Sequence, residues 1–421
     1  MAIEPVRIAE ASGASDGRGH HPTALTGMPD EPGSAASVGV GAAVRYTARL
    51  HTSFDSAGLL WRRFEATGLC TGHQGFDWVT GIAERLMPRS ASLLIVEVCD
   101  ADTGSPVMLL PLMRRRALGH HVIEWLSCGV CDYSAPLLAD DRPWTTQGAD
   151  AAWAAVRSVL PRADRIHVAG IPQKIRGVAN PLALLSVSRD SIQIVSGLAM
   201  DGEPETLIKR VCKPSFSKNF NKHCRRLEQL GPLALVEAQT PAMVEQHFAT
   251  LLDLRLNRFR ELGRFDLLTQ APVVEFYRNA ALRGLSDGSV RLFGLRVGDS
   301  WLASIYVLIK QGTLHALLLG IDQEAVHNVS PGLTTIGKLM MWARAQGLVY
   351  FDLSVGSQGY KQHIGASTAV LAELCESLTL KGRGAAAYIR LRGKTEMFVR
   401  SRPALFKAVQ GGMRRLRRLK N

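Results

Sequence analysis

The sequence predicts a mixed α+β protein made of two tandem domains, each a mostly antiparallel sheet flanked by helices. Two stretches, about two hundred residues apart, share one order of elements: three strands, a helix and a further strand. A length of 421 residues is enough for two domains that each bury a core. No residue-level identity is visible between the two stretches, so the repeat is one of architecture.

The second stretch has the clearer pattern. Residues 289–322 alternate apolar and polar side chains around two glycine-containing turns, which predicts a three-stranded antiparallel meander. A helix is expected from Pro331 to about Gln346, because its apolar residues recur on one face. The run "LVYFDLS" at 348–354 is almost continuously apolar, which is typical of a strand buried on both faces.

The first stretch repeats this outline. Its segments alternate in the same way and end on an apolar strand, and a helix is expected before the meander in each half. The expected elements are a hairpin at 92–116, a strand at 120–127, a helix at 149–159, a strand at 164–170, and preceding helices at 57–86 and 241–263.

Shifts in composition divide the chain. Residues 1–44 are rich in Gly, Ala, Ser and Pro and lack the apolar core of a secretory signal, which predicts a flexible leader. No run of about 18 apolar residues occurs, so we expect no membrane-spanning helix and a cytoplasmic protein. The expected domains are 45–205 and 206–380, followed by a basic, partly helical tail at 381–421.

The net charge of +13 is concentrated at the C-terminal end. Residues 381–421 contain thirteen Lys and Arg against one acid, Glu396, which is a net +12. The rest of the chain is therefore close to neutral, and the charge says little about what the folded body does. Such a tail either binds anionic lipid, nucleic acid or an acidic partner, or is a solubilising terminus without a dedicated partner.

The cysteines do not indicate a metal site. There are seven, and only Cys128 and Cys131 have a CxxC-like spacing. Because no second pair and no clustered histidine completes a zinc site, we expect no metal and reduced, partly buried thiols.

The triplet Ser330-Pro331-Gly332 is the main candidate for a ligand site. Ser330 is a good N-cap and proline is favoured at the first helical position, where its missing N–H costs nothing. Gly332 has no side chain, so a ligand could approach the backbone amides, which together with the helix dipole favour phosphate. An ordinary capped helix start explains Ser and Pro equally well, so both interpretations stay open.

Ionisable residues follow in the stretch after the last predicted strand. Asp352 is expected to be buried and to need a partner, for which Lys361 is the nearby candidate, as a structural or as a catalytic pair. Tyr360 is either a packing residue or a proton donor to a leaving thiolate. His315 is expected to be a satisfied strand residue, and His327 lies in the loop before the triplet.

A basic helix is expected between the two halves, in "KPSFSKNFNKHCRRLEQLG" at 213–231. Ser217 is the expected N-cap and Gly231 the expected end. The charged face is either simply solvated or an electropositive rim over an anionic ligand. Its basic residues are Lys218, Lys222, Arg225 and Arg226.

Several motifs together resemble a known family. They are the basic helix "SKNFNKHCRRLEQLG", "DLRLNRFRELG" at 253–263, "SPGLTTIGKLMMWARAQGLVYFDLSVGSQGYK", and the pattern "LLPLMRRR…DYSAPLL" at 109–138. In these features residues 213–363 resemble the acetyltransferases of the GNAT superfamily typified by the CelD/BcsL proteins, which are associated with bacterial cellulose and exopolysaccharide production. The chain departs from the family at "SVGSQGYK", where relatives often have Arg before the glycine. It also lacks the R/Q-x-x-G-x-G/A signature of standard GNAT enzymes.

The resemblance implies a GNAT fold, with two such domains in tandem as in FemAB-type transferases, and an acyl-CoA co-substrate. The resemblance implies that the fourth strand of the GNAT fold is 313–321 in this sequence, that the fifth is 349–354 and that the loop for the pyrophosphate is 327–333. The residues implied to bind the cofactor are Leu318, Leu319, Gly320, His327, Ser330, Pro331, Gly332 and Leu333, of which Leu318 to Gly320 offer backbone amides as an oxyanion site. The candidate catalytic residues are Asp352, Tyr360 and Lys361.

The function implied is acyl-CoA-dependent N- or O-acyl transfer to a small metabolite or a polysaccharide precursor. One alternative keeps the fold and uses aminoacyl-tRNA as donor, which the basic helix and tail would suit. Another is a non-enzymatic scaffold beside a polysaccharide synthase, with the basic tail at the inner membrane face.

Overall fold

The protein is described by a computed structural model that covers residues 44–117, 119–322, 328–356, 359–388 and 391. Residues 1–43 of the leader predicted at 1–44, His327 and most of the basic tail lie outside the described residues. Within the described part, no helix has the length and apolarity needed to cross a membrane.

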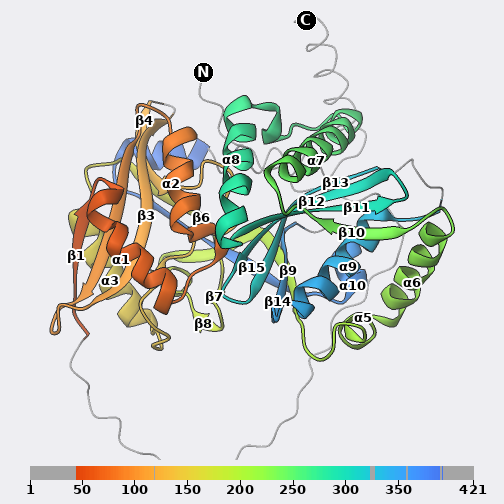
Figure 1. Cartoon of the computed structure of the whole chain (residues 1–421). Helices are drawn as coiled ribbons and strands as arrows, with labels where there is room; N and C mark the ends of the chain where they lie inside the picture. The colour runs from red at the N-terminus through yellow and green to blue at the C-terminus, as the bar shows by residue number, and fades with distance from the viewer. Residues whose placement is uncertain (1–43, 118, 323–327, 357–358, 389–390, 392–421) are drawn as a thin grey trace, which may run out of the picture.

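One large mixed sheet runs through both halves of the described chain (Figure 1). Its strands lie in the order β1-β2-β3-β4-β6-β15-β9-β14-β13-β12-β11-β10, with β5 beside β3, and most neighbours are antiparallel. The strands are β1 (Tyr46–His51), β2 (Ser92–Asp100), β3 (Pro106–Ala117), β4 (His120–Trp125), β5 (Leu137–Leu138), β6 (Arg165–Ile171), β9 (Ser188–Ala199), β10 (Leu233–Glu237), β11 (Val290–Val297), β12 (Ser300–Lys310), β13 (Thr313–Ile321), β14 (Tyr350–Val355) and β15 (Ser367–Ser377); β7 (Lys174–Ile175) and β8 (Val178–Ala179) form a separate ribbon.

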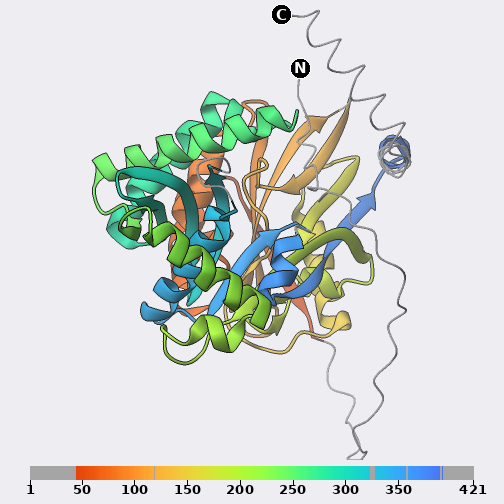
Figure 2. The ribbon, with the colours of Figure 1, turned by 90° about the vertical axis from the view of Figure 1, so that its right-hand side faces the viewer.

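Helices cover both faces of the sheet (Figure 2). One face carries a single apolar core that continues across the two halves and includes Trp61, Trp78, Phe248 and Phe276. The opposite face has one core in each half. The helices of the shared core are α1 (Phe54–Thr67), α2 (Phe76–Arg85), α7 (Pro241–Glu261) and α8 (Ala271–Asp287), with the 3-10 turns η1 (Gly72–Gln74) and η2 (Leu267–Thr269); the others are α3 (Thr146–Val159), α4 (Pro181–Leu184), α5 (Leu207–Val211), α6 (Pro214–Glu228), α9 (Pro331–Ala345) and α10 (Gly359–Ile364).

The two halves exchange their last strands. β9 closes the first half in sequence but pairs with β14 of the second half. β15 closes the second half and pairs with β6 of the first half and with β9. The halves are therefore joined by main-chain hydrogen bonds as well as by the shared core, which fixes residues of one half against the other.

Both predicted meanders and the helix and strand after each are confirmed. The helix expected at 57–86 is instead two helices separated by η1, because Gly68 and Gly72 interrupt it. The basic helix begins at Pro214 with Lys213 as N-cap, so the prediction that Ser217 caps it was wrong. Proline at the first helical position extends the helix by one turn toward its N-terminus.

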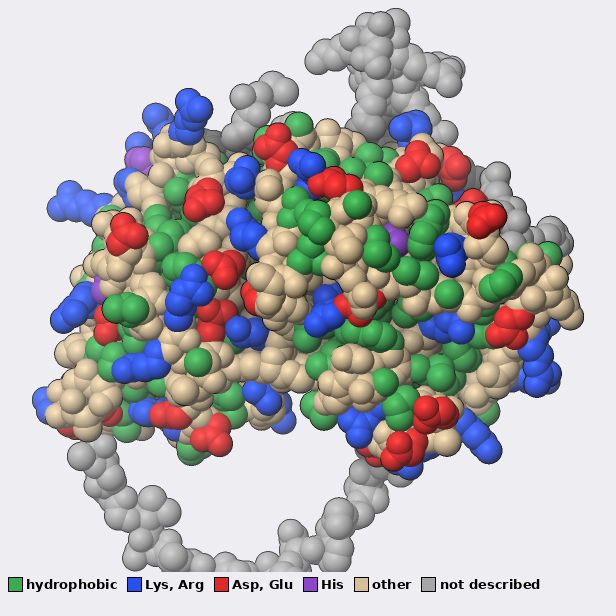
Figure 3. All heavy atoms as spheres, in the orientation of Figure 1, with side chains coloured by type: hydrophobic (Ala, Val, Ile, Leu, Met, Phe, Trp, Pro, Cys, Tyr) green, Lys and Arg blue, Asp and Glu red, His purple; other side chains and the backbone are tan. Residues whose placement is uncertain are grey.

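The surface agrees with the location of the charge in the sequence. The face seen in Figure 3 mixes Lys and Arg with Asp and Glu and shows no uniformly basic area. This is the expected result when most of the net charge belongs to the tail.

Candidate functional site

Two parallel strands separate in the second half. β13 and β14 pair over three residues only, and His315 and Asp352 are the last pair. Just past that pair each strand shifts register against its outer neighbour, β13 against β12 and β14 against β9. Such bulges bend a strand, and two bends at one level drive the strands apart. Beyond His315 and Asp352 no further pair joins β13 to β14, so the two backbones diverge from this vertex, and we call this separation of the strands the opening.

The helix that follows β13 in sequence begins at the predicted triplet. Ser330 is its N-cap, with Oγ accepting the Leu333 amide at 3.4 Å, and Pro331 occupies the first turn. Gly332 is buried, and a Cβ there would lie 2.5 Å from Cδ1 of Ile321 on β13. The glycine therefore lets α9 pack closely against β13. The sequence analysis considered Gly332 only as a place where a ligand could approach the backbone, and did not predict this packing role.

The part of β13 beyond the vertex, residues 316–321, is called its limb, and it packs under α7. Leu318 pairs with Tyr306, and Arg255 donates to the Leu319 carbonyl at 3.4 Å. Gly320 faces α7, where a Cβ would lie 2.8 Å from the Leu251 carbonyl oxygen. This limb is thus held rigidly by the second half's own helix, which suits backbone amides that must stay in place.

The basic helix α6 lies beside the start of α9. Arg226 donates to the carbonyl of Asn328, in the loop before the triplet, at 3.0 Å. α6 crosses α9 closely, since a Cβ on Gly337 would lie 2.3 Å from the Phe220 ring. Burial and the charges of Lys222 and Arg226 lower the pKa of the His223 imidazole. Arg226 thus places a positive charge next to the loop before α9.

Asp352 is fully satisfied by three donors. Its Oδ2 accepts the Tyr133 hydroxyl at 2.7 Å and lies 3.0 Å from His315 Nδ1. Its Oδ1 accepts the Ser354 amide at 2.6 Å. The basic side chain that contacts Asp352 is thus that of His315, and the prediction that Lys361 is its partner was wrong.

Lys361 and Tyr360 have other surroundings. The ammonium of Lys361, which is only 2% exposed, donates to the carbonyls of Ser354, Val355 and Gly356 at 3.0 to 3.3 Å. It thereby holds the end of β14, where Ser354 has a left-handed backbone with φ of 62°. Tyr360 is half-buried and packs against the core under α9, as a packing tyrosine would.

His315 is only partly satisfied, contrary to what its place in a strand suggested. Its Nδ1 faces Asp352, while its Nε2 is buried and has no hydrogen-bond partner among the described residues. The side chain is 4% exposed. A buried imidazole nitrogen of this kind is costly unless something completes it.

The first half supplies two rings to this cluster, which sequence reasoning missed. Tyr133 reaches Asp352, and the His73 ring lies edge-on to Tyr133 and to His315, at centroid distances of 5.2 and 5.4 Å. These residues are about 180 to 240 positions from their partners in the second half, so no local pattern could find them. The only signal was that each lies within a glycine-containing, unpatterned segment, "LCTGHQG" and "SCGVCDYS".

The corresponding strands of the first half do not leave a similar opening. β4 and β6 pair in parallel through Glu124 and His167, but the chain after β4 returns along β6. There the Ser134 amide donates to the Gly170 carbonyl at 2.8 Å. Gly170 has φ of 75°, and a Cβ on it would lie 3.0 Å from the Asp132 carbonyl oxygen. The same segment that fills this gap carries Tyr133 into the second half.

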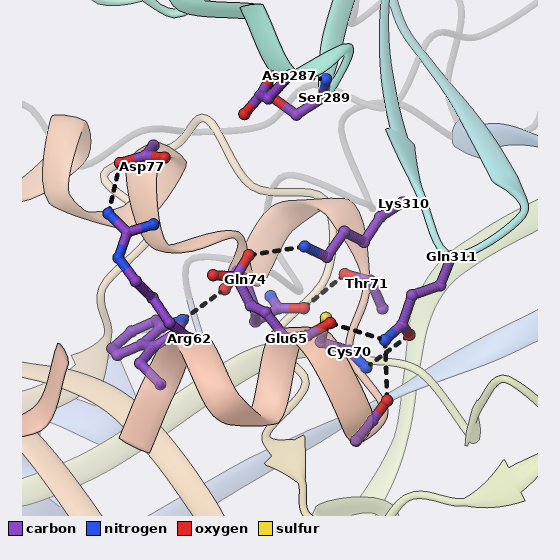
Figure 4. Close-up of polar contacts among 12 residues, drawn as sticks. Arg62, Glu65, Cys70, Thr71, Gln74, Asp77, Asp287, Ser289, Lys310 and Gln311 are labelled. Carbon is purple, nitrogen blue, oxygen red and sulfur yellow. Dashed lines mark hydrogen bonds and ion pairs between the residues drawn. The ribbon is translucent and has the colours of Figure 1, made fainter. Parts of the chain in front are cut away.

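The start of β13 is fastened to the first half (Figure 4). Gln311, in the turn before β13, donates to the carbonyls of Glu65 and Gly68 at 3.2 and 2.8 Å and accepts the Cys70 amide. Lys310 pairs with the Glu65 carboxylate at 2.8 Å. A cavity of about 60 Å³ lies here between α2 and α8. It is lined by Glu65, Gly72, Asp77, Arg283, Leu308 and Lys310, among others.

Comparison with known proteins identifies the family of the second half. Residues 214–362 match the family described as "Acetyltransferase (GNAT) domain". No curated protein matches the chain. Among solved structures, the fold is similar to "Crystal structure of FemX", with a TM-score of 0.55, 10% identity, and coverage of 79% of this chain and 97% of that one.

Two further structures are more distant. One is the C-terminal domain of a putative lysylphosphatidylglycerol synthetase from Agrobacterium fabrum, with a TM-score of 0.45, 10% identity, and coverage of 78% of this chain and 95% of that one. The other is a tandem GNAT protein from the clavulanic acid biosynthesis pathway, with a TM-score of 0.40, 12% identity, and coverage of 79% and 98%. The family match places a GNAT acetyltransferase domain in the second half, so the chain is an acyltransferase.

Proposed function

We propose that this acyltransferase moves an acyl group from acyl-CoA to an amine or hydroxyl of a small metabolite or polysaccharide precursor. The observation that carries the proposal is the opening between β13 and β14, followed by a capped helix that begins at the Ser330 triplet. The opening offers unpaired strand edges to a pantetheine chain, and the helix start offers amides to a pyrophosphate.

Each part of the cofactor would meet a suitable group. Acyl-CoA is a polyanion at one end, and Arg226 with the N-terminus of α9 gives that end positive charge. The thioester would lie along the β13 limb, where amides between Leu318 and Gly320 can stabilise the oxyanion. The reaction needs positioning more than acid–base groups, because a thioester is already activated toward amines.

The class of acceptor is proposed from the resemblance of the motifs to the CelD/BcsL proteins. This resemblance suggests a role in cellulose or exopolysaccharide synthesis in the cytoplasm. The basic tail at 381–421 would then hold the protein at the inner membrane face, near a glycan-precursor acceptor.

A second candidate donor is aminoacyl-tRNA. The basic face of α6 favours it, because Lys218, Lys222 and Arg225 are exposed beside the site. The similarity to FemX bears on the fold alone. A scaffold without catalysis is the remaining alternative.

Calorimetry on the full chain separates these candidates. We expect acetyl-CoA or a longer acyl-CoA to bind with a micromolar Kd, and CoA species to co-purify in native mass spectrometry. Binding of none of them by folded protein would reject the proposal. Salt-dependent binding of charged tRNA in preference to uncharged tRNA, without acyl-CoA binding, would establish the second candidate instead.

A further inference from the structure

We propose that His315 is the general base of this acyl transfer, oriented by Asp352 and Tyr133, so that the first half of the chain completes the catalytic site of the second. The proposal rests on the proposed acyltransferase function and names the residue that takes the proton from the acceptor. It also gives the first half a function, since Tyr133 and His73 both come from it.

The place of His315 suits a base. It is the last residue of β13 that pairs with β14, so it lies at the vertex of the opening and three positions before Leu318, where the stretch that would hold the thioester begins. A base must lie near the attacking atom, and the attacking atom must lie near the carbonyl carbon. Of the two residues that form the vertex, His315 carries the basic nitrogen and Asp352 is an acid.

The orientation of His315 is determined by its neighbours. The Asp352 carboxylate accepts a hydrogen bond from Nδ1–H of His315, which leaves the lone pair of the neutral imidazole on Nε2. Tyr133 donates to the same carboxylate oxygen, and burial together with Asp352 holds the pKa of its phenol well above the usual range. The phenol therefore stays a donor and keeps the carboxylate in place. Tyr133 and Asp352 are positioning residues in this arrangement.

The Nε2 edge of the ring faces the first half. A Cβ on Gly72 would lie 3.3 Å from His315 Cδ2, the ring carbon bonded to Nε2, and 3.0 Å from Leu308 Cβ. Gly72 and Leu308 also line the cavity between α2 and α8. Because Gly72 has no side chain, the His315 ring packs against its backbone, next to this polar cavity.

The groups that face His315 come from every element packed against it. They are Asp352 from β14, Tyr133 from the loop after β4 and His73 from η1. Charged groups of the cavity lie beyond Gly72, namely Glu65, Asp77, Arg283, Asp287 and Lys310.

A second orphan group lies next to the same vertex. Ser354, two residues past Asp352 on the diverging limb of β14, has a buried Oγ without a partner in the described part of the chain. Its left-handed backbone is a strained conformation for serine. Two unsatisfied polar groups and backbone strain at one vertex are expected where a ligand, rather than protein, completes the hydrogen bonds.

The step balances as follows. The acceptor N–H or O–H gives its proton to His315 Nε2 while the acceptor atom bonds to the thioester carbon. The tetrahedral intermediate then collapses, the C–S bond breaks, and the CoA sulfur takes the proton from Nε2 to leave as the thiol. The products are an amide or ester and free CoA, and His315 returns neutral.

Side-chain NMR of the full chain labelled with 15N-histidine tests the orientation without any acceptor. His315 is assigned by the loss of its signals in His315→Gln. We expect a protonated Nδ1 and an unprotonated Nε2 at pH 7.5, with Nε2 shifted by saturating acetyl-CoA. A proton on Nε2, or signals that acetyl-CoA leaves unchanged, would overturn the proposal.

Kinetics of CoA release from acetyl-CoA, with water, ethanolamine and glucosamine as acceptors, test the role. For His315→Gln we expect acetyl-CoA affinity within twofold of the parent, CoA release lowered about 100-fold, and loss of the rise in rate with pH. For Tyr133→Phe we expect about a tenfold loss and an altered Nδ1 signal. His247→Gln is the matched control, because His247 is also buried with one unpartnered nitrogen but lies on α7.

The outcomes separate the two proposals. If the parent binds no acyl-CoA, the proposed function fails. If His315→Gln binds acetyl-CoA normally and releases CoA at the parental rate, only the role of His315 is rejected. If His315→Gln and His247→Gln lower the rate of CoA release equally, and in each the loss of rate follows the loss of stability, His315 is structural and the proposal is wrong. The NMR experiment tests the orientation of His315 even if the enzyme uses none of these acceptors.

Discussion

His315 and Asp352 are the last residue pair that joins β13 to β14, and their side chains also meet, with Nδ1 3.0 Å from Oδ2. One pair of residues therefore marks the place where the strands separate and fills that place with ionisable groups. A carboxylate buried there is stable only because Tyr133 and the Ser354 amide also donate to it. The vertex is consequently formed by both halves of the chain.

Replacing Ser330 with Ala tests the start of α9. We expect a loss of about 1 kcal/mol in the free energy of unfolding, because the cap of the Leu333 amide is removed. Acetyl-CoA affinity should fall about fivefold, since the first turn would no longer be held for a phosphate. Thr145→Ala is the control, because Thr145 caps α3 of the first half in the same way. It should lower stability equally and leave affinity unchanged; equal affinity losses would contradict the assignment.

The role of Gly332 can be separated from that of its neighbour Ile321. Gly332→Ala should cost about 1 to 2 kcal/mol, because the new methyl meets Cδ1 of Ile321. Ile321→Val removes that Cδ1, so the double variant should recover most of the loss in a double-mutant cycle of urea unfolding. We expect acetyl-CoA affinity to recover with stability. Recovered stability with affinity still reduced would show that the ligand itself approaches Gly332.

Arg226 and Arg225 give a matched pair on one helix. Arg226 reaches the loop before α9, whereas Arg225 is exposed to solvent. Arg226→Ala should weaken acetyl-CoA binding about fivefold to tenfold and flatten its dependence on salt. Arg225→Ala removes the same charge and should change affinity less than twofold. Equal effects in calorimetry at two salt concentrations would mean that only the net charge of α6 matters.

Buried thiols predict a loss of stability in alkali. Burial raises the pKa of Cys70 to about 12, against 9.0 for an ordinary thiol. Because the folded pKa is the higher one, the contribution to stability is complete below pH 9 and is lost as the pH rises toward 12. One such thiol lowers the free energy of unfolding by up to about 1.4 kcal/mol per pH unit in that window. Urea unfolding at pH 8, 9 and 10 measures the slope, which should be smaller in Cys70→Ala. An unchanged slope would show that Cys70 does not contribute to it.

The basic tail can be removed without touching the packed segment at 380–388. Residues 392–421 hold ten Lys and Arg and one acid, Glu396. Their deletion should abolish partition onto vesicles that contain about 30% anionic lipid and leave acetyl-CoA binding unchanged. Neutral vesicles are the control. Unchanged partition of the truncated chain would remove the tail from the membrane proposal.

Local sequence patterns were sufficient to predict the helices and strands of the second half that are named here. The meander, the helix at Pro331 and the strand through Asp352 follow from short-range periodicity, glycine turns and a serine–proline cap, which act within a few residues. The same reasoning found the start of α9 but not the packing of Gly332 against Ile321, because Ile321 lies on another element.

Only the tertiary structure decided the composition of the vertex. The sequence by itself determined that Asp352 would be buried and would need a partner, and Lys361 was the nearby cation in the stretch after the strand. The partners are instead His315, 37 positions away, and Tyr133, 219 positions away. The exchange of β9 and β15 and the turn at Gln311 bring the halves together, and such contacts depend on packing between distant segments, which no local pattern encodes. Burial could be predicted because it depends on residue type and period, whereas the partner of a buried charge depends on which surfaces meet.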